Sequence, residues 1–253
     1  MRPNKLLMFL VFTFSSQAVA GLVDGDRAFN SRNYQNAYVE LLPLARDNAL
    51  AAYYVGLMFV DGLWLPQNSE IGVRWLTVAA KRGHTGAQLR LAVAYETGDG
   101  VAQDFLTAAQ WMLESARGGN ADAQYYLGRY FREGQGVIQD DVQAFEWIYR
   151  SVEYEISHER LLDALLYLGG ACEWGRGLRQ DLVEAYKWFS LASSYSSNDL
   201  RMRDEASRAL DALRIRMNAA DLALAGRRAQ AWQEEKLRMY GLSEFASATA
   251  QVP

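Results

Sequence analysis

Apolar and polar positions along the middle of the chain follow the period of short amphipathic helices. Ala87, Leu91 and Tyr95 recur four residues apart, which places them on one face of a helix. Residues 98–101 (GDGV) interrupt this pattern, because glycine readily takes the positive φ that ends a helix. A second apolar face follows Asp104, whose carboxylate can accept hydrogen bonds from free amides at a helix start. The pattern therefore predicts two short helices joined by a glycine turn.

This helix pair recurs four times. Three residue types share one series of spacings, 36, 36 and 41 residues, at Trp75, Trp111, Trp147 and Trp188, at Gly62, Gly98, Gly134 and Gly175, and at Ala51, Ala87, Ala123 and Ala164. Each second helix is predicted to bury its tryptophan. The five extra residues before the last repeat are predicted to lengthen the connection near residues 154–159.

A single helix pair cannot bury both of its apolar faces, so successive pairs must stack. The predicted fold is all-α, a right-handed superhelical solenoid of stacked antiparallel helix pairs. We place the four repeats at about residues 49–84, 85–120, 121–161 and 162–196. Less regular apolar patterns at 21–48 and 197–236 predict an N-terminal capping helix pair and C-terminal capping helices, and 237–253 is predicted to be a flexible tail.

Residues 1–20 have the pattern of a cleavable signal peptide. Arg2 and Lys5 precede an apolar stretch at 6–14 (LLMFLVFTF), and Ala18 and Ala20 give the small-residue spacing of a cleavage site. A short membrane anchor is the alternative, but nine apolar residues fall well short of the about 20 that span a bilayer. We expect a mature chain without a membrane span, exported to a bacterial periplasm. Secretion beyond the cell is left open.

Composition narrows the function classes. The chain carries 26 Lys and Arg against 30 Asp and Glu, a net charge of -4, and loss of Arg2 and Lys5 would bring it to -6. This balance gives no basic footprint for nucleic acid. One cysteine cannot form an intrachain disulfide, and two histidines supply a zinc site poorly. We therefore expect no metal and no cofactor.

Few residues suggest catalysis. His84 and His158 lie in predicted connections with no partner residue beside them, and Cys172 falls on the buried face of a first helix. The paired glycines are repeat turns rather than a nucleotide-binding fingerprint, and no nucleophile or phosphate-loop motif is present. The sequence therefore predicts a protein that is not an enzyme.

The repeat motifs resemble a known family. Residues 98–104 (GDGVAQD), 134–140 (GQGVIQD) and 175–181 (GRGLRQD), each followed by Ala-x-x-Trp, resemble the Sel-one-like repeat, a branch of the tetratricopeptide superfamily. The first repeat departs from this pattern, because residues 62–68 (GLWLPQN) lack the second glycine and the aspartate. The resemblance implies an adaptor or regulatory scaffold for envelope, secretion or signalling complexes. A cell-wall-related enzyme or penicillin-type binder is the alternative, although the regular cysteine pairs of such relatives are absent, and a secreted host-interacting factor is another.

The tetratricopeptide geometry implies a concave surface lined by the first helix of each pair. Carried onto this sequence, it selects Tyr53, Leu57, Leu89, Val93, Glu96, Tyr125, Arg129, Arg132, Leu166 and Glu173 as a surface for a protein or peptide partner. Tyrosine and arginine often dominate interface energetics, and an arginine pair can hold a carboxylate. The alternative is that these side chains only pack against a neighbouring helix. The identity of the partner and the oligomeric state do not follow from the sequence.

Overall fold

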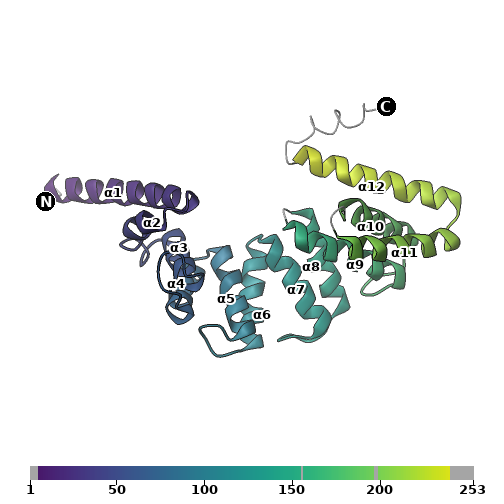
Figure 1. Cartoon of the computed structure of the whole chain (residues 1–253), viewed down its shortest axis with the longest axis horizontal. Coiled ribbons are helices and arrows are strands. Elements are labelled where there is room, and N and C mark those ends of the chain that lie inside the picture. Colours follow the sequence, from purple (N-terminus) through teal and green to yellow (C-terminus); the bar gives the residue numbers. More distant parts are fainter. Residues whose placement is uncertain (1–4, 155, 197–198, 240–253) are drawn as a thin grey trace. The chain divides into compact units, whose positions relative to one another are not determined.

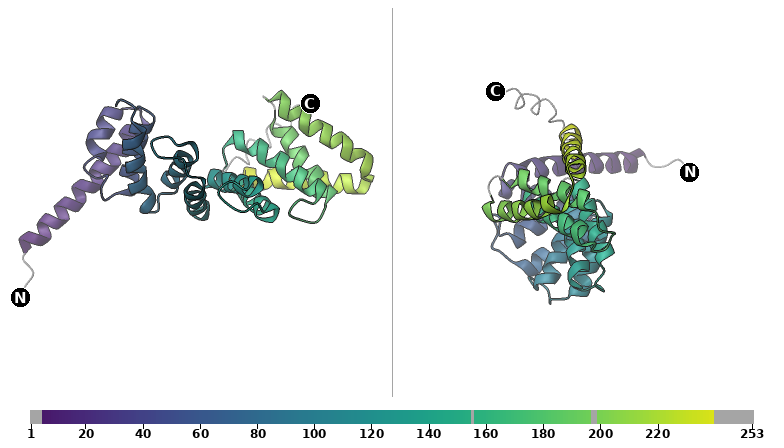
Figure 2. Two further views of the ribbon diagram at one scale, coloured as in Figure 1. Left: turned by 90° about the horizontal axis from the view of Figure 1, so that it is seen from below. Right: turned by 90° about the vertical axis from the view of Figure 1, so that its right-hand side faces the viewer.

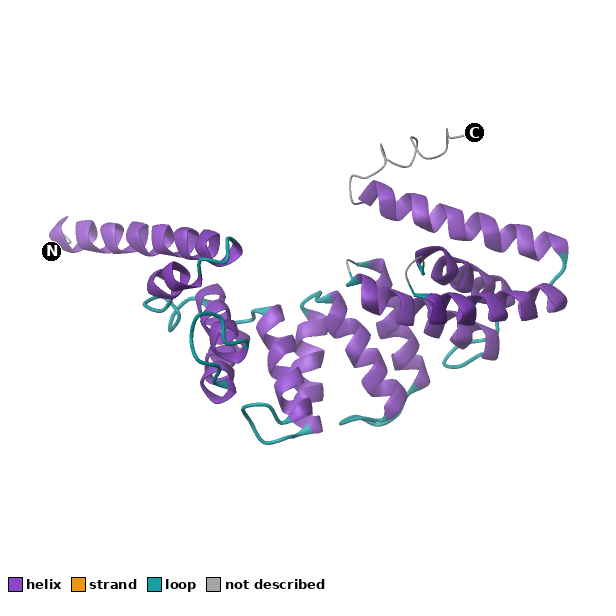
Figure 3. Cartoon of the chain, in the orientation of Figure 1, coloured by secondary structure: helices purple, strands orange, loops and turns teal. Residues whose placement is uncertain are grey.

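All regular structure in the described part of the chain is helical. The computed structural model describes residues 5–154, 156–196 and 199–239, with side chains from residue 18 onward except those of residues 158 and 159 (Figure 3). The chain forms two compact units, Met1–Ile138 (unit 1) and Gln139–Pro253 (unit 2), and each is described by itself. The prediction of an all-α fold built from helix pairs is confirmed. Residues 240–253 of the predicted tail lie outside the described residues.

Unit 1 contains the first seven helices in chain order (Figure 1). They are α1 (Lys5–Asn30), α2 (Tyr34–Leu41), α3 (Ala49–Val60), α4 (Ser69–Lys81), α5 (Thr85–Thr97), α6 (Phe105–Arg117) and α7 (Ala121–Glu133). From α3 to α7, each helix packs on the next one along the chain. Close approach within a pair depends on small residues, since a Cβ added to Gly56 would lie 3.0 Å from the Leu76 side chain. The stack is therefore continuous within unit 1.

The C-terminal part of α1 packs against α2 and α3, whereas its N-terminal part extends beyond them (Figure 1 and Figure 2). A Cβ added to Gly25 would lie 2.5 Å from Leu41, so α1 and α2 cross closely there. Phe29 stacks on Tyr54 of α3 at 4.2 Å, and the Tyr54 hydroxyl donates to the Asp26 carboxylate at 2.7 Å. Burial and the Asp26 carboxylate raise the pKa of Tyr54 to about 12, so the phenol remains a donor at neutral pH.

Unit 2 contains five helices centred on one of them. They are α8 (Asp141–Glu153), α9 (His158–Trp174), α10 (Leu182–Tyr195), α11 (Leu200–Arg216) and α12 (Ala219–Met239). The helix α10 contacts α9, α11 and α12, and its Trp188 is only 1% exposed. The Trp232 indole N–H of α12 donates to the Glu153 carboxylate at 3.1 Å, and the Lys236 ammonium donates to the Glu153 carbonyl at 2.6 Å. Helix α12 therefore contacts both α10 and the end of α8.

Most of the five extra residues before the last repeat extend a helix rather than a connection. The first helix of that repeat, α9, has 17 residues, whereas α5 and α7 have 13 each. The connection from α8 to α9 covers residues 154–157, against 82–84 and 118–120 at the equivalent places. The predicted long connection was therefore wrong. A helix continues readily through residues 158–161, because that segment contains neither glycine nor proline.

Every second helix of a repeat starts at the predicted polar residue. Asp104, Asp140 and Asp181 each accept from two backbone amides of the following turn, and Asn68 accepts from one. These contacts satisfy amides that have no partner inside the helix. The N-cap predictions are confirmed.

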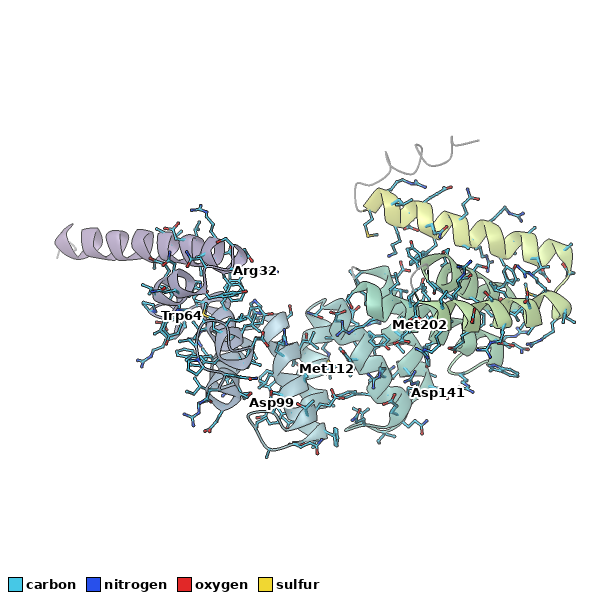
Figure 4. All side chains as sticks on the ribbon, viewed as in Figure 1. Arg32, Trp64, Asp99, Met112, Asp141 and Met202 are labelled. Atoms are coloured by element: carbon cyan, nitrogen blue, oxygen red, sulfur yellow. The ribbon has the colours of Figure 1, made fainter. Side chains whose placement is uncertain are left out.

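The second glycine of each turn is required by the preceding repeat. Gly100, Gly136 and Gly177 have φ between +68° and +74°, and a Cβ at any of them would lie closer than 3.0 Å to the backbone at the start of the preceding second helix. Trp64 holds the same place in the first repeat with φ 67°. Its side chain, labelled in Figure 4, is 51% exposed, and its ring centre lies 5.7 Å from that of Tyr38. No preceding repeat exists there, so a Cβ can be accommodated.

Candidate interaction surface

The predicted surface residues of unit 1 differ in exposure. Leu57 and Tyr125 are each only 7% exposed, so little of either side chain is open to a partner. They are therefore removed from the candidate surface. The other six residues are half-buried, namely Tyr53 on α3, Leu89, Val93 and Glu96 on α5, and Arg129 and Arg132 on α7. We refer to these six as the first-helix surface.

The two arginines of the first-helix surface share a carboxylate from their own helix. Glu133 lies 2.6 Å from the Arg132 guanidinium and 3.6 Å from that of Arg129. Burial raises the pKa of Glu133, but the Arg132 hydrogen bond and the two positive charges outweigh it, so the pKa is lowered overall. The Arg129 guanidinium also lies 5.7 Å from the centre of the Tyr126 ring. A partner carboxylate would therefore have to compete with Glu133 for this pair.

Glu96 links α5 electrostatically to α7. Its carboxylate acts on Arg129, and together with burial it raises the pKa of Tyr130, which is fully buried on α7. The negative charge of Glu96 on α5 therefore lies near the positive charge of Arg129 on α7. Such a surface offers Leu89 and Val93 as apolar contacts beside a mixed charged cluster.

His84 is a helix cap rather than a simple loop residue. Its Nδ1 accepts from the Ala87 amide at 3.1 Å, which is the role that Asn48 and Asn120 have in the neighbouring repeats. Its ring also stacks on Tyr53 at 4.2 Å. Burial lowers the pKa of His84, so the neutral imidazole that can accept this hydrogen bond is favoured.

In unit 2, the predicted residue Glu173 is covered by the protein itself. It is 7% exposed and pairs with the Arg216 guanidinium from α11. Glu173 is therefore not available to a partner, and this position of the prediction is corrected. Leu166 on α9 is half-buried. Helix α11 was predicted only as part of a cap, and nothing in its periodicity indicated that Arg216 would reach α9.

Sequence reasoning missed Trp174, the last residue of α9. This side chain is 64% exposed, and the Arg216 guanidinium lies 5.7 Å from the centre of its ring. The equivalent residues of the other repeats are Asp61, Thr97 and Glu133. A tryptophan at a position that is polar in every other repeat was the available signal.

Candidate catalytic groups have little support in the described residues. Cys172 is 1% exposed, as predicted for a packed thiol, and burial together with nearby carboxylates raises its pKa to about 12. The His158 side chain lies outside the described residues. Within the described part of the chain, no three His, Cys, Asp or Glu side chains gather as metal ligands would. No helix in that same part is long and apolar enough to cross a bilayer.

Stacked antiparallel helix pairs with a repeated glycine turn define a helical repeat protein of the solenoid class. The Sel1 repeat model matches residues 49–84, 85–120, 121–153 and 162–194, which is more than half of the chain. The chain belongs to the Sel1 repeat family, and the resemblance inferred from the sequence is confirmed. An array of these repeats is a scaffold for protein interaction.

Solved structures support the fold. A Sel1 repeat protein from Oxalobacter formigenes has a TM-score of 0.64 and 20% identity over 86% of this chain and 99% of its own. A protective antigen present in uropathogenic Escherichia coli strains, which displays an SLR fold, has a TM-score of 0.56 and 22% identity over 95% of this chain and 58% of its own. No curated protein matches the sequence significantly. At these identities the likeness concerns the fold alone.

Proposed function

We propose that this chain is an exported, non-catalytic adaptor of the bacterial cell envelope, which binds a protein partner through the first-helix surface of unit 1. The observation that carries the proposal is the half-buried set on α5 and α7 of a Sel1 repeat array, in which Leu89 and Val93 are partly exposed on α5 and the Glu96 carboxylate of the same helix acts on Arg129 of α7. Partly exposed apolar side chains next to arginine are typical of protein interfaces.

Two features of the N-terminal region support export. The apolar stretch at 6–14 and the alanines at 18 and 20 have the pattern of a signal peptide. Val19 is 63% exposed, whereas Gly21 lies against α2, where an added Cβ would lie 3.4 Å from the Glu40 side chain. Cleavage after Ala20 would therefore leave the packed part of α1 intact.

The chemistry of the one cysteine, Cys172, supports the proposal that the protein is not catalytic. A cysteine whose pKa is raised to about 12 by burial carries almost no thiolate at neutral pH, and the thiolate is the reactive form. The carboxylates at 104, 140 and 181 already accept backbone amides as helix caps. These three carboxylates therefore have a structural role as helix caps, which supports a non-catalytic function.

The partner is tested by affinity purification from a periplasmic extract with quantitative mass spectrometry. We compare the wild-type chain with Leu89→Ser/Arg129→Gln on first helices. The matched control, Leu106→Ser/Arg74→Gln, changes one exposed leucine and one exposed arginine on second helices. We expect a reproducible partner to be lost only from the first pair, while circular dichroism shows that both variants remain helical.

Either of two results would contradict the proposal. If the wild-type chain enriches no protein, the adaptor function is rejected. If the control variant loses the partner as well, the first-helix surface is not the interface. Export is checked separately by the mass of the chain recovered from the periplasm, which should correspond to an N-terminus at Gly21.

A further inference from the structure

Glu40 has an unfavourable position at the end of α2. It is the second-last residue of that helix and its only charged residue. A negative side chain is destabilising at the C-terminal end of a helix, because the helix dipole is negative there. The Glu40 side chain is exposed, and none of the residues that the structure describes forms an ion pair or hydrogen bond with its carboxylate. No contact in the described fold therefore offsets this cost.

Gly21 of α1 lies directly beside this carboxylate. A Cβ added to Gly21 would lie 3.4 Å from Glu40 Oε2 and 3.8 Å from the Glu40 carbonyl oxygen. The Gly21 nitrogen is bonded to the same Cα, so it lies within about 2.5 Å of that Cβ position. Rotation of the exposed Glu40 side chain can therefore bring its carboxylate within hydrogen-bond distance of this nitrogen.

Cleavage after Ala20 would change the chemistry of the Gly21 nitrogen. In the uncut α1 it is a neutral amide inside a helix, where amides donate to the carbonyl four residues earlier. Hydrolysis of the Ala20–Gly21 peptide bond consumes one water and leaves a carboxylate on Ala20 and an amine on Gly21. A free α-amine has a pKa of about 7.7–8.0, so it is mostly protonated at neutral pH. The mature chain would therefore gain a positive charge beside Glu40.

The end of α2 offers this ammonium a second acceptor. Pro43 has no backbone N–H, and the Leu44 amide donates to the Leu41 carbonyl rather than to that of Glu40. Among the described residues, the Glu40 carbonyl near Gly21 thus has no backbone donor. A cation at the C-terminal end of a helix is also stabilised by the helix dipole.

Glu40 is the one charge that neighbouring helices bring to this position. The helices packed on α1 are α2 and α3, and α3 contains no charged residue. On α1 itself, Asp24 pairs with Arg27 at 3.2 Å, and Asp26 accepts from the Tyr54 hydroxyl at 2.7 Å. Apart from tyrosines, the other titratable groups in α1 from Gly21 onward and in the connections that flank α2 are Asp24, Asp26, Arg27, Arg32, Arg46 and Asp47.

We propose that signal-peptide cleavage creates an ion pair between the Gly21 α-ammonium and the Glu40 carboxylate, the Gly21–Glu40 pair, which joins the new start of α1 to the end of α2. The pair rests on the proposed export and on cleavage after Ala20. Because the pair favours the charged amine, it raises the pKa of that amine in the folded state. Its stabilisation is therefore complete below the unfolded value of about 7.7–8.0 and is lost as pH rises through the higher folded value.

The test uses the mature chain recovered from a periplasmic extract, after its mass has established the N-terminus. The α-amine is labelled with acetic anhydride over a range of pH and quantified by mass spectrometry, because only the unprotonated amine reacts. We expect the pKa of the amine to be about 0.3–0.7 unit higher in the wild type than in Glu40→Gln. The wild-type amine should then be labelled about two- to fivefold more slowly at pH 7.

Hydrogen exchange of α2 gives a second readout, whose sign differs between the two possibilities. If Glu40 is paired with the ammonium, Glu40→Gln should speed exchange in α2 by about two- to fivefold at pH 6.5. If Glu40 is unpaired, the same variant removes an unfavourable charge from the end of the helix and should slow exchange. The matched control, Glu70→Gln, removes an exposed glutamate of α4 and should change neither the amine pKa nor the exchange of α2.

The outcomes separate this pair from the proposed export. If the chain begins at Gly21 but its amine has the same pKa in the wild type and in Glu40→Gln, the pair is rejected and export stands. Slower exchange of α2 in Glu40→Gln rejects the pair as well. A chain that begins at another residue, or that does not reach the periplasm, rejects the proposed cleavage and the pair with it.

Discussion

The tryptophan that recurs in every second helix has different surroundings in the two units. In unit 2, Trp188 is 1% exposed, and the rings of Tyr149 and Trp232 each meet it edge-on at 6.0 Å. In unit 1, Trp111 is half-buried and lines a hollow on α6 together with Gln110, Leu113 and Glu114. The prediction that each second helix buries its tryptophan is thus correct for Trp147 and Trp188 and wrong for Trp75 and Trp111. The same repeat position is therefore buried in unit 2 and half-buried in unit 1.

The helix that covers Trp188 in unit 2 is not part of a repeat. Helix α12 supplies Trp232, and its Lys236 is 6% exposed with its ammonium 5.2 Å from the centre of the Trp232 ring. Arg228 of the same helix pairs with Glu184 of α10 at 2.6 Å. Polar and aromatic contacts from α12 therefore cover one side of α10 in unit 2. The predictions below test whether this difference governs stability.

The largest expected effect is that of Trp188→Ala. Loss of a fully buried indole should lower the free energy of unfolding of unit 2 by about 3–5 kcal/mol, because a cavity replaces the ring. Trp111→Ala should cost unit 1 only about 1–2 kcal/mol, since that ring already contacts water. Hydrogen exchange of the full chain, followed by mass spectrometry, measures both units in one sample. Equal losses would show that α12 does not distinguish the two positions.

A smaller effect is expected at the glycine turns. Gly177→Ala should destabilise unit 2 by about 2–3 kcal/mol, because the left-handed backbone alone costs about 1–2 kcal/mol and the new Cβ would meet Asp141. Trp64→Gly should change unit 1 by less than about 1 kcal/mol, since relief of backbone strain offsets the lost contact with Tyr38. Chemical denaturation curves would test the pair. A neutral Gly177→Ala would mean that successive repeats do not require this close approach.

The smallest expected effect depends on pH. The folded state lowers the pKa of His84, so its contribution is complete above the unfolded value of 6.5 and is lost as pH falls through the lower folded value. The loss should be about 1 kcal/mol, the usual worth of an N-cap. His84→Asn should keep the cap and remove this pH dependence from α5. Hydrogen exchange at pH values on both sides of 6.5 measures it.

A reciprocal variant gives the control for this prediction. Asn120→His places the same imidazole at the start of α7, where the native amide oxygen accepts from Ala123 at 2.9 Å. We expect α7 to acquire the pH dependence that α5 has in the wild type. If neither exchange alters the pH profile, the histidine cap contributes nothing to it.

The sequence by itself determined the repeat, its helix pairs and their boundaries in the middle of the chain. Asp104, Asp140 and Asp181 cap helices as their spacing predicted, because capping is a local interaction within one turn. The glycines after each first helix take positive φ for an equally local reason. Residues within a few positions of one another carry the information for both.

Only the tertiary structure decided which side chains face water. Leu57 and Tyr125 are buried, Glu173 is covered and pairs with Arg216, and Trp174 is exposed. The spacing in one helix gives the direction of a side chain but not the neighbour it meets, and Arg216 reaches Glu173 across 43 residues of sequence. Exposure is a property of all packed elements together, so the candidate surface could be predicted by helix position but not residue by residue.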